Sequence, residues 1–587
     1  MRTWGLYLRQ VLVILVILVV ASPLSQGQPI TPSERTQFKD RFKTVIIPPP
    51  SNEARRASAA LEGLGEIVRS AGAGAGRNVQ VSKNQNPGDA LRTGASETTI
   101  AGTAGGQKLV AGWNDGEGFA FGPFVPNQPP LGLSGYGFSS DRGRTWTDGG
   151  APPIGTVIAF GPGPRGRSRT GRYITRGDPW LDVGGPGNMT FVYANLGIWE
   201  DDAALPPAGV SVHFGGFRGR RFDWTHAELI QSPNYPRDFV DKEAMVVDDT
   251  TVYITLTNFI EVCNIPFFGF GQMELYRRTP TGWARRIIQP DESLITDPSN
   301  PRCGLDGIVN QGSAPAVGPR GELYVAWERG WFEPLGSGGP PAGLPRATIA
   351  LKRSTNQGET FGPLRTVRSI CSGVLNPPAG YNRTSNNDFP RIAAAHQGRF
   401  RGRIYIAFQD CSARHGAAPF GLDTDVYVTS SDNGGDTWSS PVPLHPRADG
   451  KIQFWPVVSV ETTGAVNVAY YESREINVTP DPTDFECQVR IGGPLDNPTL
   501  RRSLLSSLVD VFHVRSRDGG ATWSEPRRVT TETTNWCAST PINSIIPNFG
   551  DYIDARSINR RTHVTWADGR NGGRINHIPT VFYATRR

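Results

Sequence analysis

Short apolar runs alternate with turns rich in Gly, Pro and polar residues along most of the chain. The runs are rich in Val, Ile, Tyr and Trp, a pattern that predicts β-strands rather than long helices. One series of strands stands out because most of its members end in an aromatic residue and a polar pair. Its members are "VAGWND" (110–115), "FVYANL" (191–196), "YITLTN" (253–258), "YVAWER" (324–329), "YIAFQD" (405–410), "VAYYES" (468–473) and "VTWADGR" (564–570).

Each of these strands follows an earlier apolar run. The earlier runs are "ETTIAG" (97–102), "DPWLDV" (178–183), "DKEAMVV" (241–247), "SAPAVG" (313–318), "DFPRIAA" (388–394), "FWPVVSV" (454–460) and "DYIDARS" (551–557). A third strand such as "DVYVTSS" (425–431) and a proline-containing fourth such as "EPRRVT" (525–530) complete the unit. Four short antiparallel strands that recur with Gly-rich turns predict an all-β fold, a β-propeller of seven four-stranded blades.

The N-terminal region differs from this pattern. It begins with two arginines, Arg2 and Arg9, followed by an apolar run, Val11 to Ala21, that is too short to span a bilayer and precedes small residues. We therefore expect a signal peptide at 1–27, no other membrane segment, and a protein that is secreted, periplasmic or on the cell surface. Residues 28–77 are predicted to form a poorly packed, partly helical leader. The propeller is expected at 78–587, and since its last unit has three strands, "NVQVSKN" (78–84) is expected to supply the fourth.

Six cysteines follow this export signal, and an even number bound for an oxidising compartment predicts disulfides. Their spacing favours the pairs Cys263–Cys303, Cys371–Cys411 and Cys487–Cys537. Because Cys-x-x-Cys and His-Glu-x-x-His are absent from the sequence, we predict no metal site and no cofactor. The formal charge of +6 is spread along the chain, which argues against a nucleic-acid partner.

A second repeat, Ser-x-Asp/Asn-x-Gly-x-Thr-Trp/Phe, occurs four times. Its fixed positions are Ser139, Asp141, Gly143 and Trp146; Ser354, Asn356, Gly358 and Phe361; Ser431, Asn433, Gly435 and Trp438; and Ser516, Asp518, Gly520 and Trp523. In each copy the Asp or Asn can accept hydrogen bonds within its own turn, the Gly permits a positive φ, and the aromatic ring can be buried. Asn in two copies keeps this geometry without the charge. We expect these four repeat turns to fasten the fold rather than to catalyse.

The repeat resembles the Asp box, or bacterial neuraminidase repeat, of the sialidase superfamily, over about residues 78–587. The resemblance implies a propeller with the boxes between third and fourth strands, away from the active site. Sialidases of the family usually have six blades, so six is the alternative to the seven counted here. The resemblance also implies three arginines around a substrate carboxylate, a Tyr nucleophile assisted by Glu, and an Asp that protonates the leaving group.

Candidate site residues come partly from the repeats and partly from this resemblance. Four inner runs begin with an acid that either caps a turn or lines the central funnel, where one could act as general acid: Asp178, Asp241, Asp388 and Asp551. "FPRIA" (389–393) is similar to the family's arginine motif, which implies Arg391 as a carboxylate clamp. Arg474 and Arg570 are further clamp candidates, with salt bridges as the alternative for each arginine. Nucleophile candidates are Tyr552 and Tyr471; Tyr471 adjoins Glu472, so their side chains would point to opposite faces of a strand.

These observations favour a carbohydrate-directed propeller whose partner is a glycan or glycoconjugate bound at the central funnel. An exo-acting glycoside hydrolase of the sialidase type is the alternative from a second class. An exported scaffold that binds a protein is the third. Whether the chain is an enzyme stays open at this point.

Overall fold

The computed structural model describes residues 77–83, 94–116, 132–153, 156–160, 169–187, 189–202, 205–264, 269–300, 303, 307–332, 347–370, 389–411, 424–445, 451–473, 508–536, 549–570 and 579–586. The predicted signal peptide and nearly all of the predicted leader lie outside these residues. So do the side chains needed to test the pairs Cys371–Cys411 and Cys487–Cys537. Cys263 and Cys303 form the predicted disulfide, which connects the segment after the second strand of blade 3 to the segment before the main strands of blade 4.

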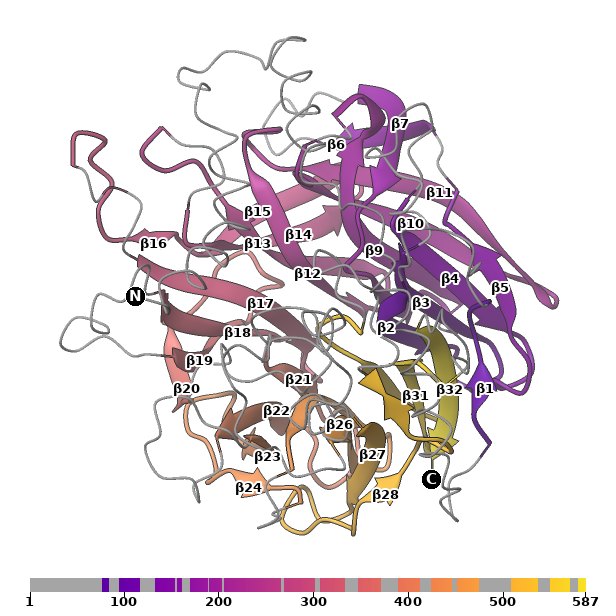
Figure 1. Cartoon of the computed structure of the whole chain (residues 1–587). Helices are drawn as coiled ribbons and strands as arrows, with labels where there is room; N and C mark the ends of the chain where they lie inside the picture. Colours follow the sequence, from indigo (N-terminus) through magenta and orange to yellow (C-terminus); the bar gives the residue numbers. More distant parts are fainter. Residues whose placement is uncertain are drawn as a thin grey trace, which may run out of the picture.

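Seven sheets stand around a common centre (Figure 1). Three blades have the predicted four strands. Blade 1 consists of β2 (Ala95–Gly102), β3 (Leu109–Asp115), β4 (Ser134–Ser139) and β5 (Thr147–Gly150); blade 3 of β12 (Phe239–Asp248), β13 (Thr251–Phe259), β14 (Gln272–Thr279) and β15 (Gly282–Gln289); and blade 5 of β21 (Arg391–Ala394), β22 (Ile404–Cys411), β23 (Thr424–Ser431) and β24 (Val442–Pro443).

Three other blades add strands to this unit. Blade 2 joins the hairpin β6 (Thr156–Phe160) and β7 (Arg169–Thr175) to β8 (Trp180–Gly184), β9 (Thr190–Trp199), β10 (Gly209–Arg218) and β11 (Arg221–Gln231); blade 4 joins β16 (Glu292–Ser293) to β17 (Gly307–Val317), β18 (Leu323–Phe332), β19 (Ala347–Ser354) and β20 (Arg365–Ser369); blade 6 joins β29 (Thr534–Asn535) to β25 (Gln453–Val460), β26 (Val466–Ser473), β27 (Leu508–Ser516) and β28 (Arg527–Arg528). Segments between the repeats thus form hydrogen bonds with backbone amide and carbonyl groups that remain unpaired within the four-strand unit.

The ring closes between its two ends. Blade 7 contains β30 (Asp554–Ile558), β31 (Arg561–Asp568) and β32 (Thr580–Arg586), and its fourth strand is β1 (Val79–Gln80). Val79 pairs with Tyr583, and Figure 1 shows indigo β1 beside yellow β32. The first strands β2, β8, β12, β17, β21, β25 and β30 contact one another in this order, and β30 contacts β2. The predicted propeller, its seven blades and its closing strand are confirmed.

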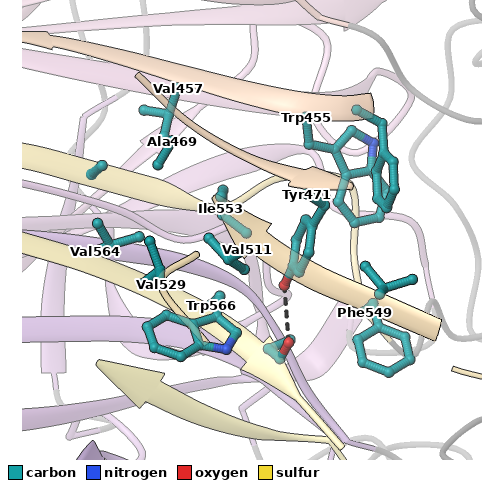
Figure 2. Close-up of a cluster of buried hydrophobic side chains, with 14 of the residues drawn as sticks. Trp455, Val457, Ala469, Tyr471, Val511, Val529, Phe549, Ile553, Val564 and Trp566 are labelled. Carbon is teal, nitrogen blue, oxygen red and sulfur yellow. Dashed lines mark hydrogen bonds between the residues drawn. The ribbon is translucent and has the colours of Figure 1, made fainter. Parts of the chain in front are cut away.

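Hydrophobic cores lie between neighbouring blades, which explains why strand residues on both faces are apolar. Figure 2 shows the core between blades 6 and 7, where Trp455, Tyr471, Phe549 and Trp566 are buried. The Tyr471 hydroxyl donates to the Ala567 carbonyl oxygen across this interface, at 2.9 Å. Each sheet is therefore stabilised by burial against two others.

The four repeat turns connect third and fourth strands, in blades 1, 4, 5 and 6. In the last copy, Asp518 Oδ1 accepts from Ser516 Oγ at 2.8 Å and from the Thr522 amide at 2.9 Å. Asn433 Oδ1 accepts the same two bonds, from Ser431 Oγ and the Thr437 amide, both at 2.9 Å. The carboxylate is thus occupied within its own turn, and an amide oxygen replaces it without a change in geometry.

These turns also hold neighbouring blades together. The repeated glycines have positive φ, and a Cβ on Gly143 or Gly435 would lie 2.2 Å from Tyr583 or 2.3 Å from Leu351 of the preceding blade. The Trp146 ring packs on Tyr583 with centroids 5.2 Å apart. Only glycine permits this approach, because it combines a left-handed backbone with no side chain.

Asp518→Ala is expected to lower the free energy of unfolding by about 0.5–1.5 kcal/mol, because the turn amide and hydroxyls lose their acceptor. Asp518→Asn should cost less than about 0.5 kcal/mol, since Asn433 already performs the same task. Urea unfolding of both variants measures the difference. Equal losses would show that the acceptor geometry is not what stabilises the turn.

Candidate functional site at the propeller axis

Residues with a left-handed backbone recur on the inner strands. Glu97, Lys242 and Trp455 have φ of 49°, at places where the pairing of β2, β12 and β25 shifts register. Asp178, with φ of 53°, immediately precedes Pro179 and the start of β8. Such a backbone is strained in residues other than glycine, and strain of this kind concentrates at functional sites.

Polar side chains at the ends of second strands support these strained positions. Asn114 Oδ1 accepts from the Asp178 amide at 2.7 Å, and its Nδ2 donates to Glu97 Oε2 at 2.8 Å. In the same way, Gln409 Oε1 accepts from the Trp455 amide at 3.0 Å. The polar residues that follow the aromatic in the repeated strands thus fix the inner strand of the next blade.

Lys242 is the centre of a buried charge cluster. Its Nζ lies 2.8 Å from Asp551 Oδ2, 2.9 Å from Asp178 Oδ2 and 3.3 Å from Glu97 Oε1. Four blades, 1, 2, 3 and 7, therefore meet at one ammonium. Burial opposes its charge, but the three carboxyl groups outweigh this effect and raise the pKa of Lys242 well above its usual value. We call Glu97, Asp178, Lys242 and Asp551 the axial cluster.

Arg391 extends from blade 5 to the other side of the ring. Its Cζ lies 4.6 Å from the ring centroid of Trp180 in blade 2 and 4.8 Å from that of Tyr552 before blade 7. The residue is 9% exposed, and no described residue forms a hydrogen bond or ion pair with its guanidinium. Burial lowers its pKa, but a guanidinium stays protonated in proteins. The site therefore holds a nearly buried cation whose hydrogen-bond donors are not used by any of the described residues.

Tyr552 joins the arginine stack to the axial cluster. Its ring lies 5.8 Å from Lys242 Nζ, and its hydroxyl donates to the Pro179 carbonyl oxygen at 3.2 Å. Burial, and then the nearby Glu97 and Asp178, raise the pKa of Tyr552 well above its ordinary value. Its hydroxyl is thus held as a donor and is not prepared to ionise as a nucleophile.

The other predicted acids differ in their surroundings. Asp551 and Asp178 belong to the axial cluster, and Asp241 accepts from Gln311 Nε2 of blade 4 at 2.5 Å. Asp388 lies outside the described residues, as does the clamp candidate Arg474.

Arg570 does not join Arg391 as a second clamp. Its guanidinium donates to Asp568 Oδ2 and Thr531 Oγ1, both at 2.6 Å, and it lies 4.3 Å from the Phe582 ring. These contacts occupy it within blade 7 and against the segment that follows β28 of blade 6. The structure thus shows the salt bridge that the sequence offered as the alternative to a clamp role.

Tyr471 and Glu472 are not a nucleophile pair. Tyr471 lies in the core of Figure 2, whereas Glu472 accepts from His445 Nδ1 and Gln453 Nε2, both at 3.1 Å. They point to opposite faces of β26, as strand geometry requires. Tyr471 thus packs in a hydrophobic core, and Glu472 forms buried hydrogen bonds.

Sequence reasoning missed Glu97, Trp180 and Lys242, although all three lie in the quoted inner runs. A charged residue inside a buried strand was the available signal, most clearly in "DKEAMVV". Within the described ranges, no group of three or more His, Cys, Asp or Glu is arranged to hold a metal ion. No helix in that part of the chain is long and apolar enough to cross a membrane.

No protein-family model matches the chain, and no curated protein matches it. Among solved structures, it is similar to an α-L-arabinofuranosidase of Fusarium graminearum in complex with arabinobiose, at 14% identity over 68% of this chain and 92% of that one, with a TM-score of 0.36. An ulvan lyase of a polysaccharide lyase family is similar at 10% identity over 87% and 98%, with a TM-score of 0.41. An α-L-arabinanase of Penicillium chrysogenum is similar at 12% identity over 69% and 95%, with a TM-score of 0.34. Similarities this low assign neither an activity nor a ligand, so the site is interpreted from its own geometry.

Proposed function

We propose that this protein binds an acidic carbohydrate at the propeller axis and that Arg391 contacts the anionic group. The observation that carries the proposal is a nearly buried guanidinium without a hydrogen bond or ion pair to the described chain, packed against two neighbouring aromatic rings. A planar fork of donors suits a carboxylate or a sulfate. The partly exposed Trp180 ring offers an apolar face on which a sugar can stack.

Export is part of this proposal, because the N-terminal 27 residues have the pattern of a signal peptide. Extracellular or periplasmic acidic glycans would then be accessible. Detection of the mature protein outside the cytoplasm, with an N-terminus near residue 28, tests this step. Retention of the intact N-terminus in the cytoplasm would contradict it.

Arg391→Ala is expected to weaken binding of an acidic glycan by about 10- to 150-fold, because charge-assisted hydrogen bonds contribute about 1.5–3 kcal/mol. Calorimetry with sialyllactose, an oligogalacturonate and a sulfated galactan oligosaccharide, each beside its neutral counterpart, measures the effect. Arg218→Ala, at the exposed outer turn of blade 2, is the matched control. Equal affinity for acidic and neutral glycans, or an unchanged Arg391→Ala variant, would refute the proposal.

Hydrolysis of the sialidase type is the second candidate, and the carboxyl groups of the axial cluster are what favours it. The hydrogen-bonded, high-pKa Tyr552 disfavours a tyrosine nucleophile. Release of fluorophore from a sialyl-umbelliferone separates the two functions. Turnover that Arg391→Ala abolishes would establish hydrolysis, whereas binding without turnover would support the binding function.

A further inference from the structure

Glu97 and Asp178 hold two carboxyl groups against one buried ammonium at the axis, and each carboxyl group affects the pKa of the other. An ionised carboxylate only accepts hydrogen bonds, so two carboxyl groups held in this way can bond each other only when one of them carries a proton. Both groups also contact Lys242 Nζ, at 3.3 and 2.9 Å. Asn114 fixes the pair from the other side, because it bonds the Glu97 side chain and the Asp178 amide.

Several charged or titratable groups face this pair from the surrounding blades. They are the carboxyl groups of Asp551, Asp241 and Glu243, the ammonium of Lys242, the guanidinium of Arg391 and the hydroxyl of Tyr552. If all three carboxyl groups on Lys242 were ionised, the axial cluster would carry two excess negative charges in a buried site. Carboxylates that share such a site do not all ionise at neutral pH.

The electrostatic surroundings agree on where the proton lies. Burial, followed by the charge of Asp178, raises the pKa of Glu97 well above its usual value. Burial also acts to raise the pKa of Asp178, but Lys242 and the hydrogen bond from Glu97 outweigh it and lower that pKa. Glu97 is therefore the donor and Asp178 the acceptor.

We propose that Glu97 and Asp178 form a proton-sharing pair that determines which ligands the axial site accepts, by keeping the site neutral enough for an anion. With the proton, the axial cluster carries one negative charge, which Arg391 balances. Without it, an anion at Arg391 would meet an excess of negative charge in a weakly screened environment. The Asp178 side chain is 11% exposed and that of Glu97 is fully buried, so Asp178 is the member of the pair that a ligand can approach. This inference rests on the proposed function, since it concerns the same anion.

Anion binding and protonation of the pair then favour each other, because coupling between two binding events is reciprocal. Affinity for an acidic glycan should fall as the pH rises through the titration of the pair, by up to about tenfold per pH unit for one linked proton. Affinity for a neutral glycan should not change in this way. A purely structural role for Glu97 would predict no such difference.

The pair itself can be tested without a ligand. Infrared titration of the full-length protein, followed at the carbonyl stretch of protonated carboxyl groups, should show one such group fewer at pH 7 in Glu97→Gln than in the wild type. Gln keeps the size and a donor but cannot titrate. Asp178→Asn serves as a second variant in case Glu97→Gln does not fold. Identical infrared bands in the wild type and a folded variant would overturn the inference.

The linkage is tested by calorimetry with sialyllactose and lactose across the pH range in which the infrared titration shows the pair losing its proton, in buffers of different ionisation enthalpy. The wild type should take up protons on binding sialyllactose, and Glu97→Gln should not. Binding without proton uptake, or the same pH dependence in both proteins, would overturn the linkage. If no acidic glycan binds, the proposed function fails and the linkage with it, while the infrared titration still decides whether the pair shares a proton.

Discussion

Lys242→Met is expected to lower the free energy of unfolding by about 3–5 kcal/mol, because it leaves buried acids without their cation. Glu97, Asp178 and Asp551 all contact this one ammonium and come from three other blades. Methionine fills much of the same volume, so the loss reflects charge more than packing. Lys352→Met is the matched control, since that lysine is half-buried and its Nζ donates to a single carbonyl oxygen, that of Ile288. Urea unfolding should show a much smaller loss there.

The pH dependence of this loss identifies its origin. Without Lys242 the acids of the axial cluster lose the charge that favours their ionised forms, so their folded pKa values rise. An acid with a raised folded pKa destabilises the protein above that pKa, and stability returns as the pH falls through it. The loss in Lys242→Met should therefore be smaller at pH 5 than at pH 8. A loss that is the same at both values would point to packing instead.

The second large effect concerns three buried histidines. Burial lowers the pKa of His213 and of His513 to about 3 and that of His563 to about 4, with nearby arginines adding to the effect at the last two. Their ring nitrogens contact Tyr173, Asn467 and Tyr583, at 2.5, 3.0 and 2.8 Å. All three histidines are thus neutral in the folded protein over a pH range in which the same histidines are protonated in the unfolded chain.

Stability is therefore expected to fall as the pH drops from about 6.5 to about 4. A group whose folded pKa is lowered contributes fully above its unfolded pKa, near 6.5, and the contribution is lost as the pH falls toward the folded pKa. Each histidine should account for about 3 kcal/mol over this interval, at about 1.4 kcal/mol per pH unit. Urea unfolding at a series of pH values measures the slope.

His563→Gln and His213→Gln should each reduce the loss of unfolding free energy between about pH 6.5 and about pH 4 by the contribution of one histidine. His396→Gln, at an exposed position, is the control and should leave the slope unchanged. Burial raises the pKa of Glu97 and of Glu243, so these two groups make the protein more stable as the pH falls, opposite to the histidines. Each variant must therefore be compared with the wild type, because the total slope contains both effects. Parallel slopes in all of these proteins would contradict the assignment to buried histidines.

The sequence by itself determined the repeating strands, the number of blades, the closing strand and the four repeat turns. These features depend on local patterns, since alternation, turn residues and aromatic ends act within one unit. The geometry of the turns at Asp518 and Asn433 follows from contacts within eight residues, so it could be predicted from the amino-acid sequence alone. A short motif at the start of an inner strand also pointed to Arg391, whose role in binding stays a prediction.

Only the tertiary structure decided which polar residues meet at the axis. Strand alternation does not predict where Lys242 and Glu97 point, because each sits at a register shift with a left-handed backbone. Their partners come from blades far apart in sequence, so no spacing rule connects them. The same closure gave Tyr471 and Arg570 other partners, since Tyr471 packs in the core between blades 6 and 7 and Arg570 bonds Asp568 and Thr531. The ring converts residues that are remote in sequence into one buried cluster, and that step depends on packing between blades rather than on any single repeat.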